Sequence, residues 1–146
     1  MARGRSITLD QWFDAGRLHA LRKAVLAEAA AAGLPRDRAS DVMLAVHELA
    51  ANAVRHGGGS GRVRLRVAGR ALHCVVSDAG RGSANGHAHA ATAVAVQPWL
   101  FKPGHGLWLV RSLADDLAVA PSPVGSRVMA VFTLPGTDRG TSRPRR

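Results

Sequence analysis

Glu48 and Asn52 are the residues whose types and spacing point most directly to chemistry. They lie four residues apart in a stretch with helical periodicity, so their side chains share one side of a helix, about one turn apart. A carboxylate beside a carboxamide offers a proton acceptor and a hard oxygen for a cation. The pair is suited to holding a hydrated magnesium ion and orienting an attacking hydroxyl or water. The alternative is a solvated polar helix face, which has the same spacing.

A second group of residues is suited to binding a flat base. Asp78 ends an expected strand and is followed closely by Gly80 and Gly82. The carboxylate of Asp78 can accept a hydrogen bond from an exocyclic amine, and glycines let a flat ligand approach the backbone closely. Ser126, at the start of a later strand, adds a hydroxyl within reach of a base or a bridging water. These residues predict the base end of a nucleotide pocket.

A third group is suited to binding phosphate. Gly104 and Gly106 flank His105 directly before an expected helix, and a helix N-terminus presents free N–H groups and the positive end of a dipole. His105 is expected to line this loop without taking part in catalysis. Lys102 either neutralises charge on the terminal phosphate or is a solvated loop residue, and both alternatives stay open. A base acceptor, a phosphate seat and a cation site together predict a nucleotide pocket.

Hydrophobic periodicity predicts the helices that carry these residues. A first helix is expected over residues 14–32, stopped by Gly33, and a second begins near Pro35, a residue that suits a first helical turn. The second helix contains the Glu48–Asn52 pair and is expected to end at Gly57 in the left-handed conformation that is common just past helix ends. A third helix is expected over residues 107–113. Apolar residues at helical spacing form the core-facing stripe of the second helix: Val42, Val46, Leu49 and Ala53.

Alternating and apolar runs predict strands at residues 63–67, 72–77, 117–120 and 127–134, and residues 6–10 are either an edge strand or an ordered lead-in. Residues 82–103 are interpreted as a lid, with a binding loop or a disordered segment as the alternatives. Hairpins combined with helices predict an α/β, two-layer sandwich: a mixed, mostly antiparallel sheet with three helices on one face. We expect a lead-in over residues 1–13, one domain over residues 14–135 and a disordered basic tail over residues 136–146.

Composition narrows the class of protein. The chain has 146 residues, 47% of them hydrophobic, and one cysteine, Cys74, which favours a reducing compartment and excludes a disulfide framework. No apolar run reaches the length of a membrane span and no signal peptide is recognisable, so we expect a cytoplasmic protein. The net charge of +10 is nearly all arginine, much of it at the two ends. Direct nucleic-acid binding is disfavoured, because no helix-turn-helix or zinc-finger spacing is present.

Taken in order, the four motifs resemble those of the gyrase, chaperone and histidine-kinase (GHKL) ATPases with the Bergerat fold, and more narrowly the anti-sigma-factor serine/threonine kinases. The family's Glu-x-x-x-Asn box matches Glu48 and Asn52, and its Asp-x-Gly-x-Gly box matches the segment from Asp78 to Gly82. Its Gly-x-Gly-Leu box matches the four residues from Gly104 to Leu107. The closing Gly-Thr matches only approximately, as Gly125 and Ser126. The resemblance extends over roughly residues 18–134.

The resemblance implies roles for these residues. Asn52 is expected to coordinate Mg²⁺, Glu48 to act as catalytic base or to orient the nucleophile, and Asp78 to accept the adenine amino group of ATP. The glycine box, including His105 and Leu107, is expected at the phosphates. The implied function is an ATP-dependent protein serine/threonine kinase that phosphorylates an antagonist protein and regulates transcription by partner sequestration.

Two other functions remain as alternatives. One is a non-catalytic ATP-binding regulator that sequesters a partner. The other is a detached histidine-kinase catalytic domain, which is disfavoured because no dimerisation helix with a phosphoacceptor histidine is recognisable. The expected partners are an antagonist protein as substrate and no membrane, with a sigma factor and a second copy of the chain left open.

Overall fold

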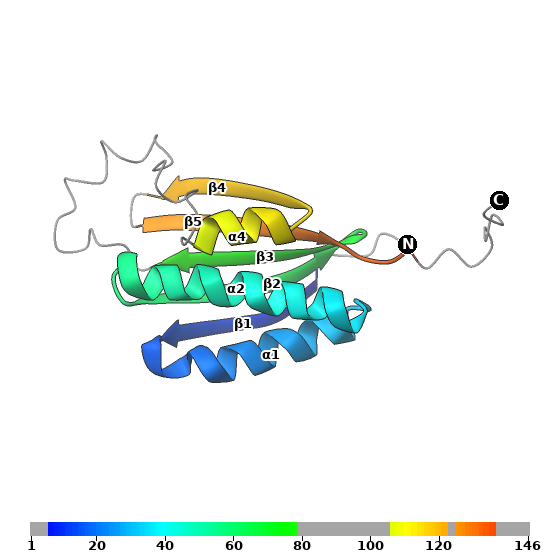
Figure 1. Cartoon of the computed structure of the whole chain (residues 1–146), viewed down its shortest axis with the longest axis horizontal. Helices are drawn as coiled ribbons and strands as arrows, with labels where there is room; N and C mark the ends of the chain where they lie inside the picture. The colour runs from blue at the N-terminus through cyan, green and yellow to red at the C-terminus, as the bar shows by residue number, and fades with distance from the viewer. Residues whose placement is uncertain (1–5, 79–105, 123–124, 137–146) are drawn as a thin grey trace.

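The computed structural model describes residues 6–78, 106–122 and 125–136. The chain runs through a strand, two long helices, a hairpin, a short helix and a second hairpin (Figure 1). A 3-10 turn at residues 15–17 joins the first strand to the first helix. The elements are β1 (Ser6–Asp14), α1 (Leu18–Ala31), α2 (Arg36–His56), β2 (Ser60–Ala68), β3 (Ala71–Asp78), α4 (Gly106–Leu113), β4 (Asp116–Ser122) and β5 (Gly125–Thr133).

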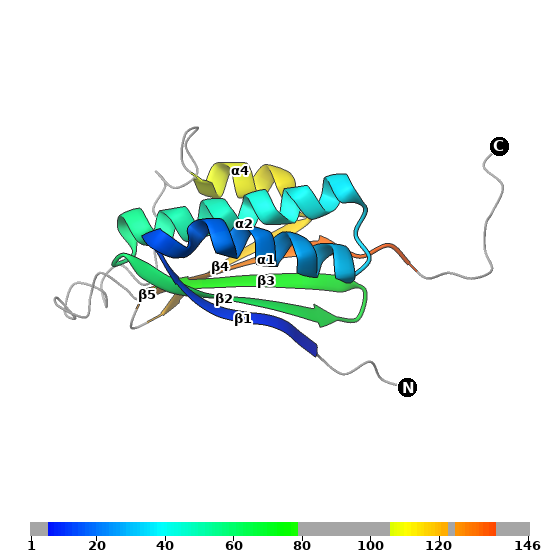
Figure 2. The ribbon, with the colours of Figure 1, turned by 90° about the horizontal axis from the view of Figure 1, so that it is seen from below.

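The five strands form one sheet in the order β1-β2-β3-β5-β4. Figure 2 shows α1, α2 and α4 together on one side of this sheet, which confirms the predicted two-layer sandwich with three helices on one face. The expected mixed character of the sheet is not found, since all four pairings between the described strands are antiparallel. Each pairing in the two hairpins is antiparallel because a tight turn reverses the chain.

The core lies between the helix layer and the helix-facing side of the sheet. The predicted stripe of α2 is confirmed, because Val42 and Val46 are fully buried and Leu49 and Ala53 nearly so. The sheet contributes alternate residues of its central strands, as the period of a half-buried strand requires: Val63, Leu65, Leu72, Cys74, Val76, Ala130 and Phe132. Burial raises the pKa of the Cys74 thiol, so this cysteine is a core residue and not a nucleophile.

The N-terminal segment belongs to the sheet. The alternative of an edge strand at residues 6–10 is confirmed, and the strand continues to Asp14 through Phe13, which is 2% exposed and anchors β1 in the core. The sheet therefore extends into the segment assigned to a lead-in. The first helix begins at Leu18, later than expected, because the carboxylate of Asp14 accepts a hydrogen bond from the Gly16 N–H at 3.0 Å and caps the 3-10 turn instead.

An arginine at the start of α2 ties this helix to the distal end of α4. Arg38 donates to the carbonyl oxygen of Leu113 at 2.9 Å and to the carboxylate of Asp115 at 3.0 Å, and its guanidinium lies 5.1 Å from the ring centroid of Phe132. Asp115 also accepts the backbone N–H of Thr133 at 2.7 Å. The Thr133 hydrogen bond and the Arg38 charge hold the pKa of Asp115 below its usual value. These contacts fix α4 against α2.

The described residues bear only in part on the predicted C-terminal tail and on membrane-spanning helices. The predicted disordered tail lies almost entirely outside the described residues, which end at residue 136. Within the described helices, none combines the length and the apolar character that a membrane crossing requires.

Candidate nucleotide-binding site

Four element ends that carry the predicted motifs meet at one end of the molecule. The C-terminal ends of α2 and β3 and the N-terminal ends of α4 and β5 lie together at the left of Figure 1. The antiparallel pairing of β3 with β5 places Ser77 opposite Arg127, so the end of β3 and the start of β5 are neighbours. The helix α2 packs against both β3 and α4. The fold therefore brings the described ends of these elements, with Asn52, Asp78, Gly106 and Ser126, to one end of the molecule.

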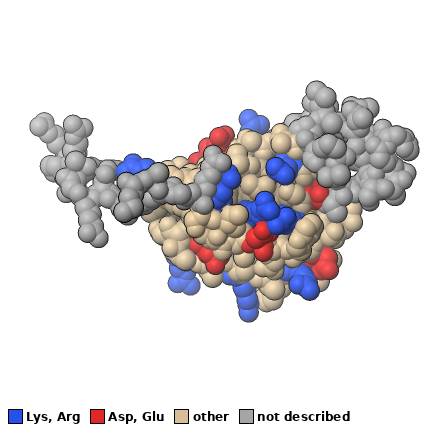
Figure 3. Space-filling view, turned by 180° about the vertical axis from the view of Figure 1, so that it is seen from behind, with Lys and Arg blue, Asp and Glu red and all other residues tan. Residues whose placement is uncertain are grey.

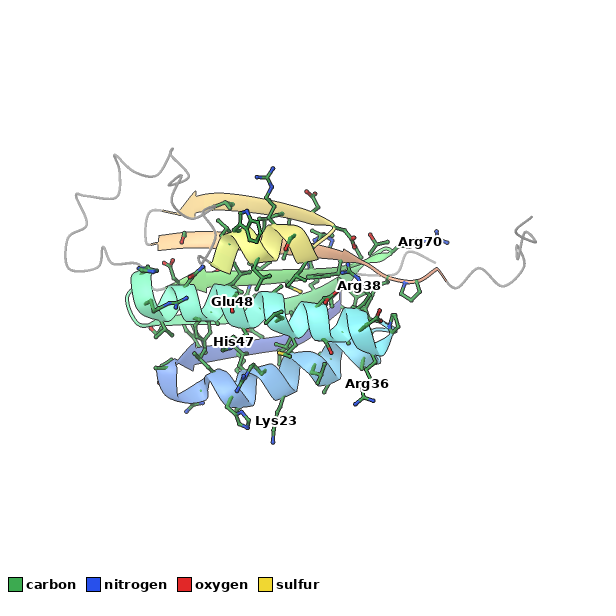
Figure 4. All side chains as sticks on the ribbon, in the orientation of Figure 1. Lys23, Arg36, Arg38, His47, Glu48 and Arg70 are labelled. Atoms are coloured by element: carbon green, nitrogen blue, oxygen red, sulfur yellow. The ribbon has the colours of Figure 1, made fainter. Side chains whose placement is uncertain are left out.

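Glu48 and Asn52 lie in the C-terminal half of α2. Glu48 and Asn52 are each partly buried, and Figure 4 shows Glu48 on α2 while its neighbour His47 projects toward α1. Among the residues that the structure describes, Glu48 makes no hydrogen bond or ion pair. The side-chain oxygen of Asn52 accepts a hydrogen bond from the guanidinium of Arg55 at 3.2 Å. The carboxylate of Glu48 is thus available to accept a proton.

Asp78 is held by the start of β5. Its carboxylate accepts two hydrogen bonds from Ser126, one from the backbone N–H at 3.0 Å and one from the hydroxyl at 2.5 Å. Two residues 48 positions apart in the sequence therefore form one unit. The two bonds from Ser126 fix the orientation of the Asp78 carboxylate. The serine in place of the family's threonine retains the hydroxyl that makes this contact.

Gly57 brings the end of α2 directly onto Asp78. A Cβ atom at Gly57 would lie 2.6 Å from the Cβ of Asp78 and 2.7 Å from both its Cγ and its Oδ2. No side chain fits in that space. The expected left-handed conformation is wrong, since Gly57 has a φ of −110°. The glycine is needed at this position for the close approach to Asp78 and not for its backbone angle.

Gly106, the second glycine of the predicted box, begins α4. The next residue, Leu107, is only 2% exposed. Leu107 and the fully buried Val110 lie on one helix side, so they anchor the first turn of α4 in the core. The predicted residues Gly80, Gly82, Lys102, Gly104 and His105, and the lid over residues 82–103, lie outside the described residues.

The described residues fit ATP with Mg²⁺ by the chemistry of their donors. Mg²⁺ prefers oxygen ligands, keeps several waters and is commonly bound by one or two protein groups together with phosphates. Asn52 supplies such an oxygen. In the described part of the chain no three His, Cys, Asp or Glu side chains cluster as a metal cage, so an ion here would rely on nucleotide phosphates. Asp78, oriented by Ser126, is an acceptor of the kind that suits the exocyclic amine of adenine.

Sequence reasoning missed two contributors to this site. Arg55 was not considered, although its spacing of three residues from Asn52 places the two side chains on one helix side. Gly57 was interpreted only as a helix end. Nothing in a single sequence indicates that Asp78 would pack against it, because the two residues meet through the tertiary fold.

Comparison with known proteins agrees with this geometry. Residues 12–132 match the family described as the histidine kinase-like ATPase domain, and no curated protein matches the chain. Among solved structures, the chain is similar to the NMR structure of the histidine kinase domain of the E. coli osmosensor EnvZ. The two are 17% identical, the similarity covers 100% of this chain and 97% of that chain, and the TM-score is 0.46. With its matched segment covering most of its length, the chain belongs to the histidine kinase-like ATPase domain family, within the GHKL superfamily.

Proposed function

We propose that this protein is an ATP-dependent serine/threonine protein kinase of the anti-sigma-factor type, whose substrate is an antagonist protein. Membership of the ATPase family supports ATP binding in general. The contact between Asp78 and Ser126 is the observation that carries the proposal, because it orients a carboxylate to accept the amino group of adenine. In this proposal Glu48 is the catalytic base and Asn52 is the ligand of Mg²⁺.

The proposed reaction transfers the γ-phosphoryl group of ATP to a serine or threonine hydroxyl. The bond between the γ-phosphorus and the β–γ bridging oxygen breaks, ADP leaves, and a bond forms to the hydroxyl oxygen. The hydroxyl proton passes to the carboxylate of Glu48, which is partly buried and makes no hydrogen bond or ion pair with a described residue. Bound Mg²⁺ would neutralise phosphate charge. The N-terminus of α4, anchored by Leu107, would present N–H groups to the phosphates.

The test is a transfer assay with a matched pair of variants. The full chain is incubated with radiolabelled ATP, Mg²⁺ and each antagonist protein encoded beside its gene, and the labelled residue is identified. Glu48→Gln should abolish labelling while retaining ATP binding, because the amide preserves shape and cannot accept the proton. The control is Glu28→Gln on α1, since Glu28 is the only other glutamate in the chain.

The possible results separate the proposal from its alternatives. Labelling of an antagonist on serine or threonine that is lost in Glu48→Gln and kept in Glu28→Gln supports the kinase. Tight ATP binding without transfer to any antagonist would show a non-catalytic regulator. Labelling that persists in Glu48→Gln would remove Glu48 from its proposed role.

A further inference from the structure

The side of the sheet opposite the helices carries an arginine-rich surface that the nucleotide site does not use. None of the described elements covers this side (Figure 2). Residues alternate in direction along each strand, so the neighbours of the buried core residues point outward here. We call this the open face. Its members on the three central strands are Arg62, Arg64 and Arg66 of β2, His73, Val75 and Ser77 of β3, and Arg127, Met129 and Val131 of β5.

On the open face, the register of the described strands places four arginines together with two carboxylates, those of Asp10 on β1 and Asp116 on β4, so positive charge exceeds negative charge. Arg62 and Arg64 both pair with the carboxylate of Asp10 on β1. The Nη2 of Arg62 lies 2.6 Å and the Nε of Arg64 lies 3.4 Å from its Oδ2. Arg66 and Arg127 form no ion pair with any residue that the structure describes. The Nε of Arg66 is moreover a buried donor without a hydrogen-bond partner. Figure 3 looks onto this side and shows Lys and Arg side chains gathered near its middle, next to acidic side chains.

The spacing of the arginines matches an extended polypeptide. Arg62, Arg64 and Arg66 occupy alternate positions of one strand, so the Cα atoms of successive arginines are about 6.6 Å apart along β2. Carboxylates at every second residue of an extended segment have the same spacing. Apolar side chains lie beside the arginines in the sheet, because Val75 pairs with Arg64 and Met129 pairs in turn with Val75.

We propose that the open face is a docking surface for an acidic, extended segment of a partner protein. Charge complementarity and the alternating spacing argue for this occupant. A single-stranded nucleic acid would need several aromatic platforms for its bases. Among the described residues the face offers only Trp12, whose ring already lies 5.4 Å from the guanidinium carbon of Arg62. The inference is independent of the proposed kinase activity, since the nucleotide site lies on the helix side.

The test measures binding of a defined probe without nucleotide. A short fluorescein-labelled peptide with glutamate at every second position is titrated with the full chain at physiological ionic strength, and anisotropy is read. The test variant is Arg66→Glu/Arg127→Glu. The control is Lys23→Glu/Arg36→Glu, which changes the net charge equally on the helix layer (Figure 4). We expect the test variant to lose about tenfold or more in affinity, and the control to change by less than about twofold.

Loss of peptide binding in the test variant alone supports the docking surface. Equal losses in both variants, or no binding of the peptide to the wild-type chain, would overturn it. If a thymidine oligonucleotide binds more tightly than the peptide, and only the test variant loses this binding, the open face would be a nucleic-acid surface instead. Should the test variant fail to fold, NMR shift mapping on the wild-type chain replaces it. Peptide-induced shifts concentrated on β2 and β5 support the proposal, and shifts concentrated on α1 and α2 contradict it.

Discussion

Replacing Gly57 by alanine tests how the end of α2 positions the proposed adenine acceptor. The added methyl group would lie 2.6–2.7 Å from three atoms of Asp78, whereas carbon atoms in contact are separated by about 3.5–4.0 Å. Either α2 or Asp78 must therefore shift by about 1 Å. A shift of Asp78 would lengthen its bond to the hydroxyl of Ser126, now 2.5 Å.

The effect of Gly57→Ala on the free energy of unfolding can be bounded from the packing around Gly57. Insertion of a methyl group into a filled space costs about 1–3 kcal/mol. Gly57 has a φ of −110°, which alanine can adopt. At such a position, replacing glycine by alanine stabilises the fold by about 0.4–1 kcal/mol, because it restricts the unfolded chain. The net loss of stability is thus about 0–2.6 kcal/mol. If displacement of Asp78 absorbs the strain, ATP affinity falls by about 5- to 150-fold, since about 1.4 kcal/mol corresponds to a factor of ten.

The assay compares Gly57→Ala with a control that is destabilised elsewhere. Gly33, at the end of α1, has a φ of +104° and no atom within 4 Å of an added Cβ. Gly33→Ala therefore costs about 1–3 kcal/mol through its backbone angle without touching Asp78. Urea denaturation gives the stability of each variant, and isothermal titration gives the affinity for ATP·Mg²⁺. We expect reduced affinity only in Gly57→Ala. Wild-type affinity in Gly57→Ala, or the same loss in both variants, would refute the reasoning.

Three further predictions concern hydrogen bonds and charge. Ser126→Ala should lower ATP affinity by about 2- to 10-fold, because one hydrogen bond to Asp78 is lost, whereas threonine at this position should retain affinity in the same titration. Arg55→Ala should lower the Mg²⁺ concentration needed for nucleotide binding, because it frees the oxygen of Asn52 and removes a positive charge; an unchanged or higher requirement would contradict this. The pKa of Asp115 is lower in the folded than in the unfolded protein, so its carboxylate stabilises the fold. This stabilisation is fully present at a pH above the unfolded pKa of about 3.9 and is lost as the pH falls through the folded pKa. Asp115→Asn should therefore lower stability at neutral pH by at most about 1 kcal/mol, with a difference from wild type that narrows in acid, as urea denaturation across pH would show.

Local periodicity was enough to predict most of the fold. The stripe from Val42 to Ala53 defined α2, and the alternation of valine or leucine with arginine defined β2. The extent of β1 was less predictable, because Phe13 is buried by contacts with distant elements and because residues 6–14 lack a clean alternation. The order of the strands, and the pairing of β1 with β2 and of β3 with β5, depend on contacts across the chain that no local pattern encodes.

The site was predictable as a set of motifs and not as a set of contacts. Asp78 and Ser126 were assigned to one pocket because each fell at the end of an expected strand, and the structure joins them directly. The roles of Glu48 and Asn52 remain predictions that the geometry supports. Gly57 shows the limit of sequence reasoning, since its type was explained by a helix end while the physical reason is the carboxylate packed against it.

Calorimetric titration of the full chain with ATP and with GTP, both with Mg²⁺, tests the central claim most directly. The account predicts that ATP binds about tenfold or more tightly than GTP, because the carboxylate of Asp78 accepts a hydrogen bond from the amino group of adenine and meets an acceptor in guanine. It further predicts that Asp78→Asn reduces this preference. Absence of ATP binding at millimolar concentrations, or an equal affinity for the two nucleotides, would contradict the account.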